Sequence, residues 1–157
     1  MQTLSDMQRS LTYKSTLRYA LWSLAYVVYA SLGTIYLFLP PLLGVLFFLF
    51  SEALRRKNSI MLLFIVADIL VLETQKGFLV FTLLIYFLLF EHFISPKIKQ
   101  SINSKKFRIF LTVFLAYTGY LLFSALLSQI FLLPAVSFDL YIVYYIVIEF
   151  FIVSVLL

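Results

Sequence analysis

Three carboxylic acids are the residues of this sequence best placed to do chemistry. Asp68 lies near the middle of the apolar stretch 60–72, Glu149 lies inside the last apolar stretch, and Glu91 ends another, followed by His92. An ionisable side chain inside a membrane-length apolar segment is costly to bury, and such residues are functional candidates by default. The chemistry open to them is proton transfer, cation binding or metal binding.

Two interpretations of Asp68 stay open. In the functional interpretation, it is a proton or cation site, or the partner of a buried basic group. In the structural interpretation, it is a protonated or hydrogen-bonded residue that fixes a helix interface. No lysine or arginine lies within the apolar stretches to pair with it. Glu149 is a weaker version of the same case, and we expect it to face the interior of a helix bundle.

The Glu91-His92 pair suggests metal or acid–base chemistry less strongly. Adjacent residues point about 100° apart on a helix, and His92 is the only histidine of the chain. A solvated helix end beside a basic loop is therefore the favoured interpretation of Glu91. Glu52 is expected to pair with Arg55 or Arg56, which follow it by three and four residues.

Catalytic motifs are missing from the sequence. It contains no HExxH, no GxSxG, no glycine-rich phosphate loop and no aspartate-rich metal motif. An intramembrane aspartyl enzyme would need two facing carboxylates, and nothing in the sequence pairs Asp68 with Glu149 or Asp139. We expect neither an enzyme nor a bound metal or cofactor.

The elements that position these acids follow from composition. The 157 residues are 64% hydrophobic and 12% charged, with a mean hydropathy of +1.07, whereas a soluble domain carries about 25% charged residues. A water-soluble fold of this size does not hide so much apolar surface, so lipid is the expected solvent. There is no cysteine, which excludes disulfides, thiolate metal sites and cysteine nucleophiles.

Six stretches are long and apolar enough to be helices in a bilayer about 30 Å thick. After a polar, basic N-terminal tail of residues 1–18, they cover residues 19–39, 41–54, 59–75, 77–95, 109–131 and 140–157. Breaks are predicted at Pro40-Pro41, at Ser95-Pro96 and at Pro134, because proline interrupts a helix. Another is predicted at Gly77 and the polar run 73–76 before it. The second and third stretches are short, and a re-entrant hairpin is their alternative. The basic run 55–57 between them favours a turn in water.

The basic residues predict the topology. With the N-terminus in the cytoplasm, 11 of the 12 Lys and Arg residues lie on that side and only Lys76 lies outside. Short loops are where this positive-inside bias is informative, so we expect six spans of the bacterial inner membrane with both termini inside. One loop holds five of the basic residues, which are Lys97, Lys99, Lys105, Lys106 and Arg108. It is either this topological signal alone or also a site for anionic lipid headgroups or an acidic partner.

Small residues predict where helices approach closely, because lipid gives helices no hydrophobic reason to associate. Ala30 and Gly33 mark the first span, and Gly119 and Ser124 mark the fifth. We expect both helices to pack closely, either within the bundle or against a partner helix.

The order of these features resembles the rod-shape-determining protein MreD family, over most of the chain. The matching features are a proline turn after the first span (Leu39 to Gly44), a basic turn (Arg55 to Lys57), an aspartate-bearing third span (Phe64 to Asp68), Gly77, and a basic loop (Lys97 to Arg108). The family's third span usually carries glycine before the aspartate, where this chain has Ile65-Val66-Ala67.

The resemblance implies a non-catalytic membrane subunit of the elongation machinery. Such a subunit would bind an MreC-like single-pass partner, help to position the actin-like filament and work beside peptidoglycan synthases; no nucleic-acid partner is expected. The family's fold is similar to that of the substrate-binding subunits of vitamin transporters, so a transporter subunit is the main alternative. A third is a small proton-coupled or ion-conducting bundle centred on Asp68.

Overall fold

The computed structural model describes residues 2–132 and 141–156, and every regular element in these ranges is a helix. The elements are α1 (Gln2–Ile35), α2 (Leu43–Arg55), α3 (Ser59–Lys76), α4 (Thr82–Leu89), the π-helical turn η1 (Phe90–Ile94), α5 (Ser95–Ser101), α6 (Lys105–Phe131) and α7 (Tyr141–Leu156). Because α4, η1 and α5 follow one another without a break, the described ranges hold six continuous helical segments. The all-α class is thus confirmed.

Membrane crossing is a separate question from helix content. Among the described helices, α6 alone is long and apolar enough to qualify as a span by length and composition, and α7 contains a shorter apolar helix. The core helix of a soluble protein can pass the same test. The six-span arrangement therefore stays a prediction.

Several helix boundaries differ from those that the sequence predicts. The first helix begins within the N-terminal tail, at Gln2, and ends at Ile35 instead of residue 39. Gly77 does not open the fourth helix: with φ 69° it terminates α3, since glycine adopts the left-handed conformation at little cost, and α4 begins only at Thr82. The break predicted at Pro134 lies outside the described residues.

The fourth and fifth segments also depart from the predicted ends. Ser95-Pro96 does not stop the fourth segment, because Pro96 falls in the first turn of α5, where a missing backbone N–H is tolerated, directly after the π-helical turn. The segment continues to Ser101. Helix α6 begins at Lys105, four residues before the predicted start, so three residues assigned to the basic loop lie in its first turn.

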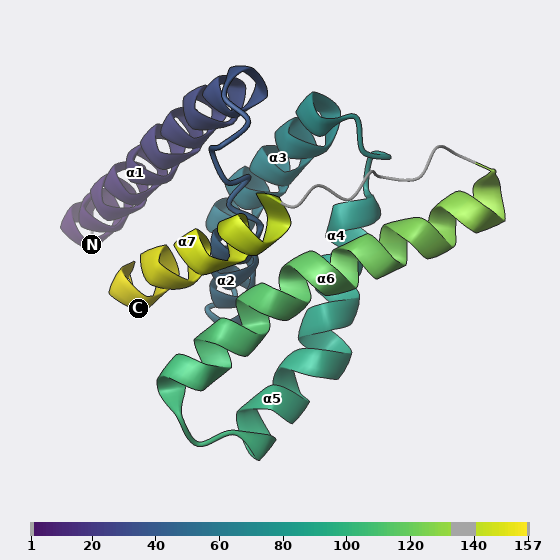
Figure 1. Ribbon diagram of the computed structural model, residues 1–157. Helices are drawn as coiled ribbons and strands as arrows, with labels where there is room; N and C mark the ends of the chain where they lie inside the picture. The colour runs from purple at the N-terminus through teal and green to yellow at the C-terminus, as the bar shows by residue number, and fades with distance from the viewer. Residues whose placement is uncertain (1, 133–140, 157) are drawn as a thin grey trace.

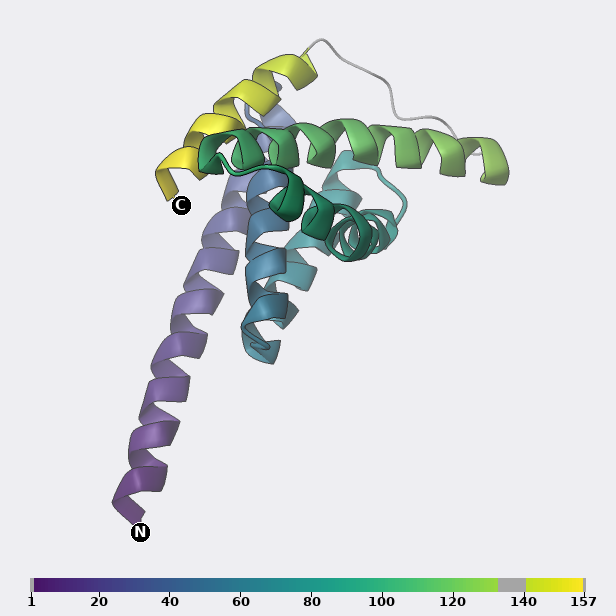
Figure 2. The ribbon, with the colours of Figure 1, turned by 90° about the horizontal axis from the view of Figure 1, so that it is seen from below.

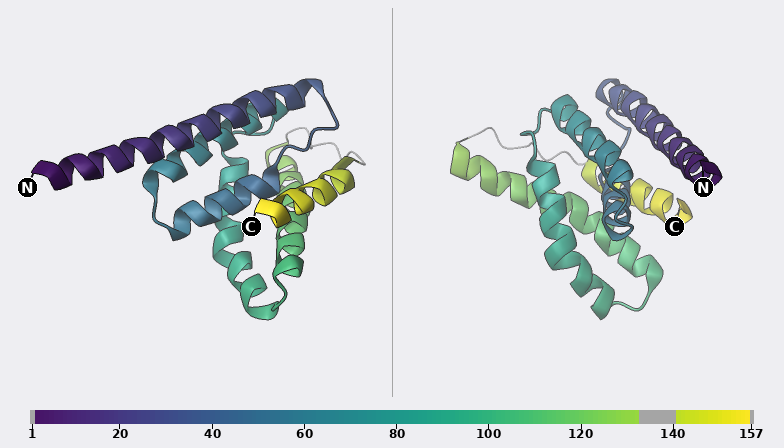
Figure 3. Two further views of the ribbon diagram at one scale, coloured as in Figure 1. Left: turned by 90° about the vertical axis from the view of Figure 1, so that its left-hand side faces the viewer. Right: turned by 180° about the vertical axis from the view of Figure 1, so that it is seen from behind.

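The helices are arranged around α2 (Figure 1). Helix α1 packs along α3, whereas α2 contacts α3, α6 and α7. Helix α6 packs on α7, α2 and α4, and Figure 3 shows it from two further sides. The N-terminal part of α1 projects beyond the other helices (Figure 2). Helix α1 is therefore the peripheral element of the fold.

Aromatic side chains fill the core. Phe47 makes edge-to-face contacts with Phe87 and Phe90, at ring-centroid distances of 5.3 and 4.5 Å, a favourable geometry for aromatic pairs. Tyr86 and Tyr120 continue this cluster toward α6. The outer surface is also apolar, with large hydrophobic side chains exposed on each of the six helical segments. Soluble monomers rarely expose so much contiguous apolar surface.

Of the four small residues that the sequence predicts at helix contacts, three are buried or contact another helix. Ala30 and Gly33 are buried on α1, and the carbonyl oxygen of Gly33 accepts a hydrogen bond of 3.1 Å from Lys76 Nζ at the end of α3. Partial burial lowers the pKa of Lys76. Gly119 lies against the hydroxyl end of the Tyr86 side chain. Ser124 is half-buried and its hydroxyl donates within its own helix, to the carbonyl of Leu121.

The two helical glycines provide a matched test of this packing. Gly119→Ala places a methyl group against the hydroxyl and ring of Tyr86, whereas a methyl group at Gly33 meets nothing within 4 Å. Overpacking costs about 1–3 kcal/mol, so thermal unfolding in detergent should show a clear loss of stability for Gly119→Ala. Gly33→Ala should leave the melting temperature unchanged or slightly raised. Equal melting temperatures for the two variants would contradict the α4–α6 contact.

Candidate functional site

Glu149 is fully buried on α7, where it binds the beginning of α2. Its Oε2 accepts the backbone N–H of Gly44 at 2.6 Å, and its Oε1 accepts the hydroxyl of Tyr117 from α6. The backbone N–H groups of Leu43 and Val45, on either side of Gly44, lie near the same carboxylate. The first N–H groups of a helix have no partner within the helix and attract negative charge. Glu149 therefore caps α2 from 105 residues away.

The local sequence explains why α2 needs this distant cap. Its N-cap residue, Leu42, has φ 57° and provides no side-chain hydrogen bond. The close approach also requires a glycine at position 44, because a Cβ there would lie 2.7 Å from Oε2 of Glu149 and 3.0 Å from Val113 Cγ2. The residues Leu42 to Gly44 after the proline turn thus leave space for a carboxylate from another helix.

Glu73 repeats this arrangement at the beginning of α4. It is fully buried near the end of α3 and accepts the backbone N–H groups of Phe81 at 2.7 Å and Leu83 at 2.5 Å. Phe81, the N-cap residue, has φ 71° and no side-chain cap. Thr82 bonds to both Glu73 and Tyr120 through its hydroxyl, which links this cap to α6.

The sequence pattern does not reveal the capping role of Glu73, which lies in the polar run 73–76. A signal was present: an acid lies eight residues before Phe81, where an apolar helix begins with no capping residue of its own. The prediction that Glu149 faces the interior is confirmed by its burial. Both glutamates use their oxygens as hydrogen-bond acceptors for backbone groups, and the part of the chain that the structure describes holds no cluster of three or more metal-ligating side chains.

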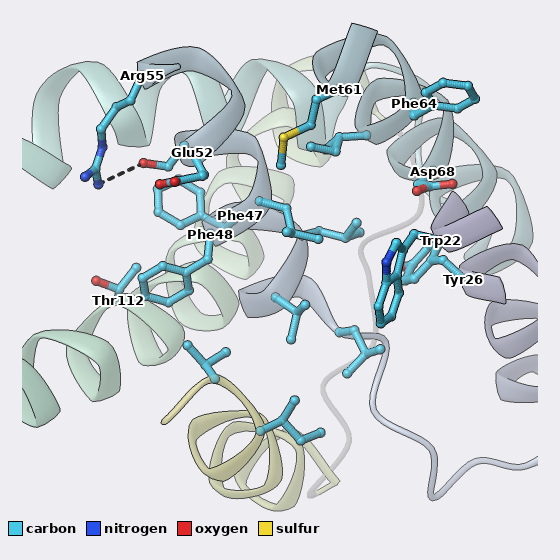
Figure 4. A pocket seen from close by; sticks show the side chains of 18 of the residues that line it. Trp22, Tyr26, Phe47, Phe48, Glu52, Arg55, Met61, Phe64, Asp68 and Thr112 are labelled. Carbon is cyan, nitrogen blue, oxygen red and sulfur yellow. Dashed lines mark hydrogen bonds between the residues drawn. The ribbon is translucent and has the colours of Figure 1, made fainter. Parts of the chain in front are cut away.

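Asp68 lies apart from these caps, on the face of α3 that meets α1. It is 7% exposed, and its Oδ1 accepts a hydrogen bond of 2.6 Å from Ser23 Oγ. Trp22 and Tyr26, both from α1, lie beside it (Figure 4). This bond crosses the interface between α1 and α3, which matches the helix-interface interpretation of Asp68.

A pocket of about 910 Å³ opens beside Asp68. Its walls come from α1, α2, α3, α5, α6 and α7. Asp68, Trp22 and Tyr26 lie on one side of it, and Arg55 with Glu52 lie on the opposite side (Figure 4). The pocket therefore joins an aromatic region at α1 to a charged region at the end of α2.

Glu91 belongs to the charged region but does not line the pocket. It is bridged by Lys99 at 3.4 Å and by Arg55 at 4.0 Å, and its side chain is 17% exposed. Its Oε2 is buried without a hydrogen-bond partner. Glu91 is thus less exposed than a solvated helix end, because it joins the end of α2 to α5. The predicted pairing of Glu52 is confirmed, with Arg56 Nε at 2.6 Å.

The five residues of the predicted basic loop divide into two groups. Lys99, Lys105 and Arg108 line the pocket, whereas Lys97 and Lys106 are exposed and do not line it. This division could not be read from their order in the sequence, because it depends on which side of α5 and α6 faces α2.

No protein-family model, no curated protein and no solved structure matches this chain. The resemblance to the MreD family accordingly rests on the layout of the sequence.

The caps can be tested by removing one carboxylate at a time. Glu149→Leu and Glu73→Leu each leave backbone N–H groups buried without acceptors, and each unsatisfied buried group costs about 1–3 kcal/mol. Both variants should lose several degrees of melting temperature in detergent. Glu52→Leu is the control, because its ion pair with Arg56 is exposed and such pairs contribute about 0–1 kcal/mol. Similar losses for all three variants would refute the capping role.

Proposed function

We propose that this chain is a multi-pass protein of the bacterial inner membrane that acts as a non-catalytic scaffold. Its role would be in the cell-shape and peptidoglycan elongation complex, where it binds an MreC-like single-pass partner and, through it, an actin-like filament. The non-catalytic role is supported by the structural role of the two buried glutamates. Glu149 and Glu73 hold helix ends together, and their oxygens are taken up by backbone N–H groups and by the hydroxyls of Tyr117 and Thr82.

The distribution of charge and apolar surface supports the membrane placement. Basic residues from α1, the end of α2, α5 and the beginning of α6 gather around one pocket, as the predicted cytoplasmic side requires. Large apolar side chains cover the outside of the helices. In a bilayer this surface faces lipid, whereas in water it would favour aggregation.

The peripheral position of α1 supports the scaffold role. This helix packs mainly on α3, and its outer face exposes Leu21, Leu24 and Val28 at 59%, 65% and 56%. A partner helix in a membrane associates by van der Waals packing on such an available face. The N-terminal part of α1 also extends past the bundle (Figure 2), toward the side where a filament would lie.

A second candidate function is supported by the pocket. A cavity of about 910 Å³ is in the size range of small-molecule sites, so a substrate-binding subunit of a vitamin-type transporter is the alternative. A proton-coupled transporter centred on Asp68 is a variant of it. The bond between Ser23 and Asp68 favours the scaffold, since it uses the aspartate to hold α1 on α3.

The topology can be measured with introduced cysteines, because the chain has none of its own. Lys57→Cys and Lys97→Cys should react with a membrane-impermeant maleimide only in inside-out vesicles. Leu79→Cys, in the turn before α4, should react in intact spheroplasts. Labelling of Lys57→Cys and Leu79→Cys from the same side would show that α3 does not cross the membrane.

Partner binding and shape separate the two candidate functions. Affinity purification of the chain in mild detergent should recover a single-pass membrane protein and an actin-like filament protein, and deletion should turn rod-shaped cells round. Asp68→Asn should preserve rod shape when protein levels are matched, because an amide oxygen still accepts the hydroxyl of Ser23. Loss of a coupled solute flux in Asp68→Asn cells of normal shape would favour the transporter.

A further inference from the structure

The pocket beside α1 is charged at one end and apolar along its length. Its positive end is formed by basic side chains from four helical segments. These side chains are Arg18, Arg55, Arg56, Lys99, Lys105 and Arg108. Only two acids share the lining, Glu52 and Asp68. Glu52 is bound to Arg56, and Asp68 accepts the hydroxyl of Ser23. The lining therefore carries an excess of positive charge, even with Glu91 close to Arg55 and Lys99.

Most of the remaining lining is apolar or aromatic. It includes Trp22, Phe47, Phe48, Met61, Phe64 and Val153, drawn from α1, α2, α3 and α7. On α1 the lining extends from Arg18 to Tyr29, which is about 16 Å of helix at 1.5 Å per residue. Half of a hydrocarbon core is about 15 Å thick. The apolar part of the pocket is thus as deep as one leaflet, with the positive end at its surface.

We propose that this pocket binds one anionic phospholipid from the cytoplasmic leaflet. The phosphate would lie among Arg55, Lys99 and Arg108, and an acyl chain would lie between α1 and the wall formed by α2, α3 and α7. The charge complementarity and the depth identify this occupant, because a soluble anion uses only the positive end. Asp68 lies on the side of the pocket opposite Arg55 (Figure 4), away from the proposed position of the phosphate, and its carboxylate accepts the hydroxyl of Ser23.

Such a lipid would complete the fold on the side where α1 stands away from α2 and α7. Helix α1 packs mainly on α3, so an acyl chain in the pocket would link it to the remaining helices. The inference rests on the membrane placement of the proposed function, which cysteine labelling tests separately. It does not depend on the identity of the partner protein.

Trp22 provides the measurement, because it lines the pocket and is the only tryptophan of the chain. The full chain is reconstituted in phosphatidylcholine vesicles with increasing fractions of dibrominated phosphatidylglycerol, and quenching of Trp22 is compared with that by dibrominated phosphatidylcholine. Each basic residue near an anionic lipid contributes about fivefold to affinity. We expect phosphatidylglycerol to be preferred at least tenfold.

Two double variants test whether the preference for phosphatidylglycerol comes from the pocket. The double variant Arg55→Gln/Arg108→Gln should lose it, whereas Lys97→Gln/Lys106→Gln, which removes the same charge outside the pocket, should keep it. Equal losses in the two double variants would show a general surface attraction and overturn the proposal. So would the absence of a preference in the unmodified chain.

Two further measurements address the occupant. Ala25→Phe narrows the pocket from α1, and Val28→Phe adds the same ring on the face of α1 outside the lining. Native mass spectrometry should find phosphatidylglycerol retained by Val28→Phe and lost from Ala25→Phe. Displacement of the lipid by millimolar inorganic phosphate would identify a soluble-anion site instead, and retention of lipid by both variants would also contradict the acyl-chain position.

Discussion

The N-terminal backbone amides of α2 and α4 lie in the interior of the molecule, and an apolar interior offers them no water. Each buried N–H group therefore needs an acceptor from the protein. The residues before both helices adopt left-handed conformations and have no side chain that can cap. Glu149 and Glu73 provide the acceptors, and the packing of four helices follows from where these two carboxylates must lie.

The cap on α2 organises one half of the fold. Because Glu149 must reach Gly44, α7 lies against the beginning of α2, and Tyr117 brings α6 to the same point. The cap on α4 similarly connects α3 to α6 through Thr82 and Tyr120. Helix α1 takes part in neither cap. It is held on α3 instead, by Ser23 and Asp68 and by the bond from Lys76 to Gly33, and this separate attachment leaves room for the pocket.

Hydropathy was sufficient to predict the helical segments, because apolar stretches of this length have few other ways to satisfy their backbone. It was not sufficient for their ends, which depend on particular residues: Gly77 ends a helix instead of starting one, and Pro96 sits within a helix after a π-helical turn. Glu149 and Asp68 stood out as isolated acids. The sequence does not show that Lys99 lines a pocket and Lys97 does not. Both this difference and the pocket itself depend on how helices distant in sequence face one another.

Amide hydrogen exchange tests the central claim most directly, namely that distant glutamates satisfy the first turns of α2 and α4. In the unmodified chain the amides of Gly44 and Leu83 should both exchange slowly. Glu149→Leu should accelerate exchange at Gly44 by at least about tenfold, corresponding to about 1.4 kcal/mol, and leave Leu83 protected. Unchanged protection at Gly44, or equal acceleration at both amides, would contradict the account.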